Sequence, residues 1–389
     1  MNLFDLIFPK QRERKEAMHQ LKMLTAYRAA FTSWNGCIYE SELVRAAVDA
    51  IARNIAKLKV EIQGSARADL QTILRKHPNE WQTWYQFLYR LATIWAIDNT
   101  AFIVPVFDKS GDIKGLFPIL PRKCEILEFH GELWLRYEFS HGGRAALPMK
   151  ECGVMTRFQY EKDFFGSSNA ALDPTMALID LQNQGIKEGI KNSATFRFMA
   201  QMGNFADDED IKKERLQFNE DNLKGEGGLL LFSNRFTNIK QIDAKPFTVD
   251  AEQMKLIQDS VYNYFGVNEK VLQSRAYGDE WSAFYESVVE AFAIQFSEVM
   301  TKMLFTDREQ ANGSLIMATA NRLQYMTNAD KLSVSAQMLD RGIMSRNEVR
   351  EIWNLPPIDD GDNYIIRGEY YDASDKLNEE EDGNAGEDV

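Results

Sequence analysis

The stretch from Thr100 to Phe158 decides the fold, because it is a succession of short β-rich runs. They read AFIVPVFD (101–108), IKGLFPIL (113–120), KCEILEF (123–129), ELWLRYEF (132–139) and GVMTRF (153–158). Turn-forming residues separate them, as in Ser110-Gly111-Asp112 and His141-Gly142-Gly143. Runs of β-branched and aromatic residues bounded by such turns are typical of strands. The sequence therefore predicts a meander of about five strands.

Two amphipathic helices are predicted before these strands. In residues 41–59, Ser41 is a suitable N-cap, and one face carries Val44, Val48, Ile51, Ile55 and Leu58. Residues 80–97 repeat the pattern with Trp81, Trp84, Leu88, Leu91 and Trp95. Few basic residues accompany this aromatic stripe, so core packing is favoured over nucleic-acid stacking. Helices and strands together predict an α+β unit.

A long helix is predicted after the strands. Asp173-Pro174 is a strong helix start, and the pattern runs to about Met202. Gly185 and Gly189 lie in its interior, where each costs about 1 kcal/mol relative to alanine. Either a neighbour approaches the backbone closely there, or the glycines have no special role.

Shorter elements follow. The acidic residues 207–210 suit the start of a helix ending near Asn222, and Gly225–Gly228 breaks the chain before two strands at 229–232 and 237–242. Asp250 caps a further helix that ends at Gly266.

The C-terminal third is predicted to be mostly helical. Residues 267–282 are loop-like, and a helix of roughly 35 Å follows from Ala283 to Phe305. Residues 328–354 are helical until Pro356-Pro357, and the acidic stretch 376–389 has the composition of a disordered tail.

Composition excludes several classes of protein. The 389 residues suit about two domains, and the net charge of −13 argues against an ordinary basic DNA-binding protein but not against a conduit through which DNA slides. No apolar run reaches the roughly 18 residues of a membrane span, and Met1–Lys10 does not fit a signal peptide. Three cysteines, none at CxxC spacing, favour a reducing compartment.

The usual catalytic motifs are missing from the sequence. It has no phosphate-binding loop, no G-x-S-x-G elbow, and only four histidines, none at metal-site spacing. We therefore expect no catalytic site, metal or cofactor. A nuclease site built from scattered carboxylates stays open as an alternative.

Four stretches then form a recognisable series. They are VRAAVDAIARNIAKL (44–58) with HPNEWQTWYQFL (77–88), DNTAF (98–102), FTVD (247–250) leading to FGVN (265–268), and LDRGIMSRNEVR (339–350) followed by Pro356-Pro357 and Gly361-Asp362. In this order they resemble the portal proteins of tailed double-stranded DNA bacteriophages, of the long-tailed siphophage type. Asp98 departs from the family's glycine, and FGSS (165–168) keeps its Gly-x-Ser-Pro only in part.

The resemblance implies a portal fold with an α/β wing, a two-helix stem, a small α/β clip, a long helix behind a tunnel loop, a helical crown, and a closed ring. The implied segments are the wing (1–170), first stem helix (171–204), clip (205–247), second stem helix (248–266), tunnel loop (267–282), long helix with return to the wing (283–327), crown (328–375) and disordered acidic tail (376–389).

The resemblance also implies a function. Such proteins form a ring, usually of twelve subunits, at one capsid vertex, where DNA is packaged and ejected. Implied partners are duplex DNA, the terminase large subunit, a head–tail connector or adaptor, and the major capsid and scaffolding proteins, with no membrane. The protein would be assembled in the host cytoplasm and reside in the virion. The alternatives are a carboxylate-dependent DNA-processing enzyme and another head–tail connector component.

Three groups of residues are implied as functional. The channel-facing tunnel loop comprises Gln273, Ser274, Arg275, Ala276, Tyr277, Gly278, Asp279, Glu280 and Trp281. Partner docking at the clip falls on Gly227, Gly228, Leu229, Phe232, Asn234, Arg235 and Phe236. Gly185 and Gly189 would allow close packing of the stem.

Overall fold

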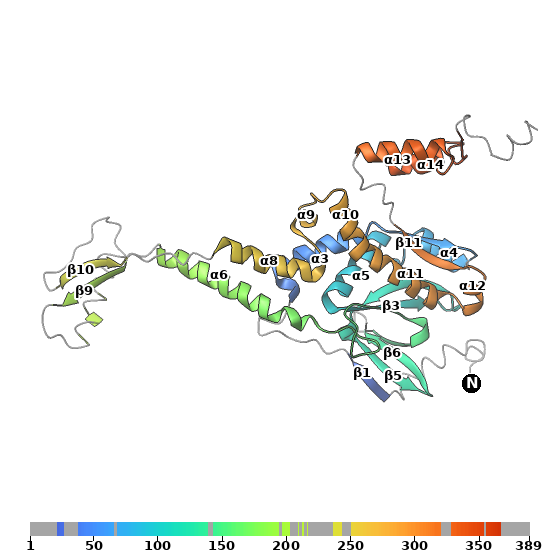
Figure 1. Ribbon diagram of the computed structural model, residues 1–389. Helices are drawn as coiled ribbons and strands as arrows, with labels where there is room; N and C mark the ends of the chain where they lie inside the picture. The colour runs from blue at the N-terminus through green and yellow to red at the C-terminus, as the bar shows by residue number, and fades with distance from the viewer. Residues whose placement is uncertain are drawn as a thin grey trace, which may run out of the picture. The chain divides into compact units, whose positions relative to one another are not determined.

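The computed structural model divides into two compact units (Figure 1). Unit 1 joins Met1–Leu172 to Asp259–Val389, and unit 2 is Asp173–Gln258. The structure describes residues 22–26, 38–65, 68–138, 143–193, 197–202, 209, 212–213, 216, 236–242, 250–319, 328–353 and 355–366.

Unit 1 contains two antiparallel sheets where the sequence predicts one meander. One sheet has the order β1-β5-β6-β7, and the other has the order β4-β3-β8. Their strands are β1 (Lys22–Ala26), β3 (Thr100–Phe107), β4 (Ile113–Ile119), β5 (Cys124–Phe129), β6 (Glu132–Glu138), β7 (Arg144–Pro148) and β8 (Gly153–Thr156). The chain does not continue alongside β7 but returns, so that β8 pairs with β3 through Thr100↔Thr156 and Ile103↔Gly153.

The sequence analysis missed β7, whose sequence RAALP is poor in β-branched residues. The strand forms because β6 provides a partner, with Trp134 opposite Pro148 and Glu138 opposite Arg144. β7 is the last strand of its sheet, where a proline costs no ladder hydrogen bond.

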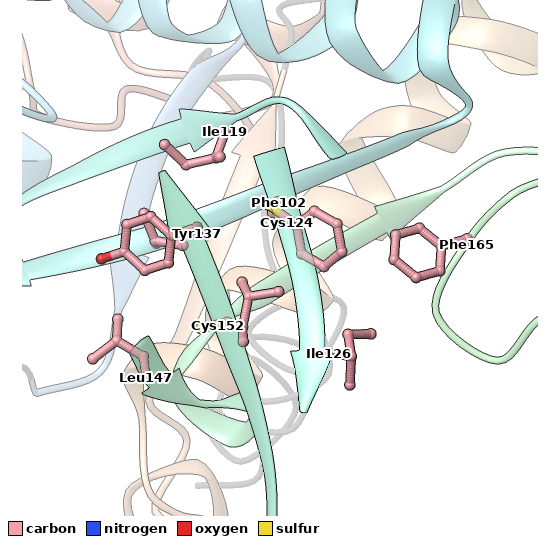
Figure 2. Packing of buried hydrophobic residues seen from close by; sticks show 10 residues of the cluster. Phe102, Ile119, Cys124, Ile126, Tyr137, Leu147, Cys152 and Phe165 are labelled. Atoms are coloured by element: carbon pink, nitrogen blue, oxygen red, sulfur yellow. The ribbon is translucent and has the colours of Figure 1, made fainter. Parts of the chain in front are cut away.

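One apolar cluster is formed by both sheets (Figure 2). Phe102 and Ile119 come from the three-stranded sheet, and Ile126, Tyr137 and Leu147 come from the other. Cys124, Cys152 and Phe165 complete the labelled cluster, and Phe102 meets Phe165 edge to face at 5.8 Å. Both cysteines are buried free thiols. Burial raises the pKa of the Cys124 thiol well above its ordinary value, so this side chain packs as a small apolar group.

Two long helices pack together on this framework. α3 (Glu42–Ile55) begins after Ser41 as predicted, and α5 (Trp84–Asp98) is capped by Thr83 and Gln86 in a reciprocal pair of hydrogen bonds. The predicted burial is confirmed for Leu88, Leu91 and Trp95, but Trp81 is 65% exposed and precedes the helix. The Thr83 cap starts the helix too late to include Trp81, which instead meets Phe117 edge to face.

A third sheet joins residues that are far apart in the sequence. β2 (Lys59–Gln63) pairs with β11 (Leu315–Thr319) in antiparallel register, with Gln63 opposite Leu315. α4 (Ala68–Arg75) follows β2, and α12 (Asp307–Ala311) precedes β11. Short 3-10 turns occur at Ile38–Glu40, Pro121–Lys123, Met149–Glu151 and Asn169–Leu172.

Unit 2 begins with α6 (Asp173–Ser193), which is shorter than predicted. The predicted helix runs to Met202, but Arg197–Met202 forms β9 and pairs with β10 (Phe236–Ile242). Hydrogen bonds to a strand more than thirty residues later override the local helical pattern. The predicted strand at 229–232 lies outside the described residues, as does most of the predicted helix near 207–222.

The predicted helix after Asp250 is confirmed as α8 (Ala251–Phe265). The Glu252 N–H donates to the Asp250 side chain, and Gly266 follows the helix at φ +77°. The boundary between the two units falls within α8.

The long helix predicted from Ala283 is longer than expected and contains a π-helical turn. α10 (Asp279–Phe284) leads into a π-helix (Tyr285–Glu290) and then into α11 (Ala291–Leu304). Phe284, Val288, Phe292 and Phe296 recur at every fourth residue and are all buried. A strict four-residue repeat drifts around an α-helix of 3.6 residues per turn, and a wider π turn compensates for the drift.

The C-terminal helical run is interrupted rather than continuous. α13 (Asn328–Asp340) and α14 (Arg346–Ile352) are separated by a turn in which Gly342 has φ +68°. Ser345 and Glu348 cap α14 reciprocally, as their spacing suggests. The stretch 376–389 lies outside the described residues. In the described part of the chain, no helix is both long and apolar enough to cross a membrane.

Candidate functional site

The best-defined candidate site is the segment Gln273–Trp281, which projects from unit 1 between two helices. The prediction of a loop over 267–282 is only partly correct, because the one-turn helix α9 (Glu269–Leu272) and the first residues of α10 lie within it. The non-helical part of the segment is therefore Gln273–Gly278.

Most residues of the whole segment are exposed, Tyr277 by 65%, whereas Glu280 and Trp281 are half-buried. Ala276 is buried, which holds the middle of the segment against the body. The segment therefore presents a cation and an aromatic ring, on Arg275 and Tyr277, to whatever lies outside this chain.

The backbone of the segment has a specific shape. Ser274 and Gly278 have φ of +57° and +58°, in the region that favours glycine. The Arg275 N–H donates to the Lys270 carbonyl at 2.7 Å, which closes the end of α9. The Ser282 N–H donates to the Gly278 carbonyl at 3.0 Å, which opens α10. Both ends of the segment are thus tied into helices.

An ion pair crosses the base of the segment. The Lys270 Nζ lies 2.5 Å from Glu280 Oε1, and both side chains are substantially exposed. Exposed ion pairs of this kind contribute roughly 0–1 kcal/mol to stability, so this pair alone does not fix the conformation of the segment. Arg275 is outnumbered by Asp279 and Glu280, which leaves the segment without the excess positive charge that would grip a polyanion.

The helix that follows the segment, α10 through α11, packs tightly against the core of unit 1. Phe292 meets Trp95 of α5 edge to face at 5.3 Å and stacks on Phe296 at 6.2 Å. Val288 in the π turn lies against Gly266, where an added Cβ would come within 2.9 Å of its Cγ2. The start of α9 and the helix after the segment are therefore anchored in the same core.

A buried polar cluster lies in unit 1 where the chain leaves for unit 2 and where it returns. Asn169 donates to the Ile97 carbonyl and accepts hydrogen bonds from Asn99 and from the Tyr264 hydroxyl. Arg157 donates to the Tyr264 carbonyl at 2.9 Å. Its guanidinium carbon lies 4.5–5.9 Å from the centroids of four aromatic rings, those of Trp95, Phe158, Tyr264 and Phe265.

Arg157 links the segment after β8 to the end of α8 within this cluster. Burial lowers the pKa of its guanidinium, whereas the aromatic faces and the Tyr264 carbonyl near the C-terminus of α8 favour the cation. Asn99 lies in one of the stretches singled out in the sequence and Tyr264 directly precedes another, and both make internal hydrogen bonds to Asn169.

The other implied site residues are described only in part. Gly227, Gly228, Leu229, Phe232, Asn234 and Arg235 lie outside the described residues, and Phe236 begins β10 opposite Met202. Gly185 and Gly189 are half-buried, four residues apart in α6. Among the described residues, no group of three or more His, Cys, Asp or Glu side chains could hold a metal ion.

Sequence reasoning missed three residues that support the candidate segment: Asp49, Arg53 and Tyr89. Arg53 of α3 donates to the carbonyls of Val271 and Leu272, just before the segment. The spacing of Asp49 and Arg53 on one helix face indicates an ion pair, but nothing local indicates the distant carbonyls.

Comparison with known families matches the phage portal protein model over residues 42–354. The chain belongs to the phage portal protein family. A search of curated proteins finds no match.

Solved structures with the same fold include portal and neck proteins. A chain in the neck of an empty gene transfer agent particle, computed with C6 symmetry, has a TM-score of 0.52 at 15% identity, over 85% of this portal-family chain and 97% of that chain. A chain in the neck of the native particle, computed with C12 symmetry, has a TM-score of 0.51 at 15% identity. That match covers 90% of this chain and 100% of the neck chain. An HK97-family phage portal protein from Corynebacterium diphtheriae has a TM-score of 0.50 at 10% identity. That match covers 75% of this chain and 96% of the other chain.

Proposed function

We propose that this protein is the portal subunit of a tailed double-stranded DNA phage. Copies of it close into a ring, of twelve subunits, at one capsid vertex of the virion. The observation that carries the proposal is the family match across residues 42–354, combined with a fold shared with a neck protein over 90% of the chain. That neck was computed with C12 symmetry, which supports a cyclic arrangement of heterologous interfaces.

We assign a different role to each segment of the chain. Residues 1–170 form the wing, α6 within 171–204 and α8 within 248–266 form the two stem helices, and 205–247 form the clip. The clip docks the terminase large subunit during packaging and the head–tail connector afterwards. The crown at 328–375 and the wing face the capsid and scaffolding proteins. The separate compact unit Asp173–Gln258 supports a stem and clip that fold apart from the wing.

The segment Gln273–Trp281 faces the channel and touches the DNA as it passes. Its exposed Arg275 and Tyr277 reach phosphates and sugars briefly, while Asp279 and Glu280 prevent a lasting grip. The protein as a whole carries a net charge of −13, which keeps duplex DNA from binding tightly.

The portal acts as a passive conduit. It catalyses no reaction, and it needs no metal or cofactor. The sequence contains no phosphate-binding loop, so the energy for moving DNA comes from the separate terminase motor.

Deleting Arg275–Asp279 tests the channel role. We expect rings of normal mass but a marked loss of DNA packaged or retained. The deletion removes the exposed Arg275 and Tyr277 with one buried side chain, Ala276, and the first residue of α10, and it leaves the buried face of α11 unchanged. Ring mass, and packaged DNA per particle by nuclease protection, are the measurements. The point variant Asp307→Asn, in the exposed turn of α12, is the matched control and should package normally. Normal packaging by the deletion variant would contradict the channel role, and loss of folding would contradict the assignment of this segment as a loop.

A further inference from the structure

We propose that Arg53, held in place by Asp49 and Tyr89, is the positioning residue for the segment Gln273–Trp281. The inference rests on the proposed channel role of that segment, but its structural part can be tested independently. Arg53 itself touches neither the exposed part of the segment nor the DNA, and it acts through the backbone of α9.

The need for such a residue follows from the size of α9. A helix of four residues, Glu269–Leu272, is far too short to be stable through its own hydrogen bonds. Asn268 caps its first turn by accepting the Val271 N–H at 2.9 Å, and the Val271 side chain is buried. These contacts hold the beginning of α9. At its C-terminal end, from which the segment departs, the Arg275 N–H donates to the Lys270 carbonyl, and a side chain of α3 adds hydrogen bonds to the next two carbonyls.

Arg53 provides that support. Its Nη2 lies 3.3 Å from the Val271 carbonyl and 3.0 Å from the Leu272 carbonyl. Carbonyl groups at a helix C-terminus lack partners within the helix and carry partial negative charge, which a guanidinium satisfies well. The Ser274 N–H donates to the same Val271 carbonyl, so the support and the first turn of the segment meet at one atom.

Two further residues orient Arg53. Its Nη1 lies 3.5 Å from Asp49 Oδ2, one turn earlier on α3, and the Tyr89 hydroxyl of α5 donates to Asp49 Oδ1 at 2.8 Å. Burial, and then the bond to Asp49, raise the pKa of Tyr89, so its hydroxyl remains a donor at neutral pH. Tyr89, Asp49 and Arg53 therefore form a continuous chain of hydrogen bonds from α5 through α3 to the base of the segment.

This chain fixes where the segment begins. Arg53 and Asp49 are partly exposed, with 32% and 43% of their side chains accessible, so replacing them leaves the apolar core intact. The far end of the segment has its own fixed point in the first turn of α10. Loosening Arg53 should consequently release Gln273–Gly278 while α10 and α11 stay in place.

The test compares full-length Arg53→Gln with Arg45→Gln by hydrogen exchange. Arg45 is a matched control because it lies on the same helix and donates to a backbone carbonyl, that of Tyr39, at 3.2 Å. Loss of charged hydrogen bonds at the base should speed exchange of the Ser274 and Arg275 amides about tenfold. The control should leave both amides unchanged, and the two variants should have the same melting temperature.

Graded variants separate positioning from a general structural role. Arg53→Lys keeps the charge but not the planar fork, so it should restore part of the protection. Tyr89→Phe removes one hydroxyl and should give a smaller increase at the same two amides. Unchanged exchange in Arg53→Gln overturns the inference. If that variant fails to fold, unchanged exchange in both Arg53→Lys and Tyr89→Phe overturns it instead.

DNA retention distinguishes this inference from the proposed function. If exchange rises in Arg53→Gln and DNA retention falls, both are supported. If exchange rises but retention equals that of Arg45→Gln, Arg53 still positions the segment, and the channel role of the segment is rejected.

Discussion

Two asparagine side chains connect irregular segments of the chain through hydrogen bonds to backbone groups. Asn79 accepts the N–H groups of Trp81 and Gln82 and donates to the Leu116 carbonyl. Asn347 likewise accepts the Ile358 N–H and donates to the Ile358 carbonyl. An amide can donate and accept at once, so one side chain can replace the partner strand or helix that an irregular segment lacks. The asparagines in the stretches singled out in the sequence therefore have a structural role.

Gly166→Ala should destabilise unit 1 severely. An added Cβ would lie 2.1 Å from the Arg157 carbonyl oxygen and 2.2 Å from that of Asn99, and both are backbone atoms that side-chain rotation cannot move. We expect a loss of about 3 kcal/mol or more in the free energy of unfolding, measured by urea denaturation. Gly131→Ala, where φ is +79° but no atom lies near the Cβ, should cost only about 1 kcal/mol. Equal losses would show that crowding at Gly166 is unimportant.

At the scale of elements, local signals and distant partners compete. The helices α3, α5 and α8 agree with their sequence patterns because spacing and caps act within one or two turns. The sequence RFMAQM at 197–202 continues a helical pattern, yet it forms β9 because β10 pairs with it. In the long helix, the four-residue repeat of Phe284 and Val288 is accommodated by the π turn.

Replacing both glycines of α6 by alanine should separate helix stability from assembly. Gly185→Ala with Gly189→Ala should raise the stability of α6 in the monomer by about 1 kcal/mol for each change, seen as a higher melting temperature by circular dichroism. If stem helices approach closely in the ring, the same variant should form fewer rings by mass photometry. Lys187→Ala, on an exposed position of the same helix, should leave ring yield unchanged. Undiminished ring yield in the double variant would contradict the packing role of these glycines.

At the scale of the whole molecule, both the net charge and the fold are consistent with the proposed portal function. A net charge of −13 opposes tight binding of duplex DNA, which fits the proposed role of a channel through which DNA slides. In the proposed ring, DNA would be kept in place by enclosure and not by attraction to a basic surface. The separate unit Asp173–Gln258 fits a subunit whose parts contact different partners.

The purified chain should form closed rings and should not cut DNA. Native mass measurement and negative-stain images at high protein concentration should give a cyclic species, with twelve subunits expected. Incubation with linear duplex and magnesium should leave the DNA intact, with a known nuclease as positive control. A strictly monomeric protein at every concentration and salt, or magnesium-dependent cleavage that copurifies with it, would count against the portal assignment.

The amino-acid sequence alone was enough to predict most of α3, α5 and α8, several helix caps, and the order of motifs that resembles phage portals. These features depend on neighbours three or four residues away, so they can be read along the chain. Only the tertiary structure decided that the predicted meander splits into two sheets, that β2 pairs with β11, and that Arg53 reaches carbonyls 218 and 219 residues later. Such contacts depend on which backbone groups remain unpaired once the core has formed, and that is a property of the folded chain as a whole.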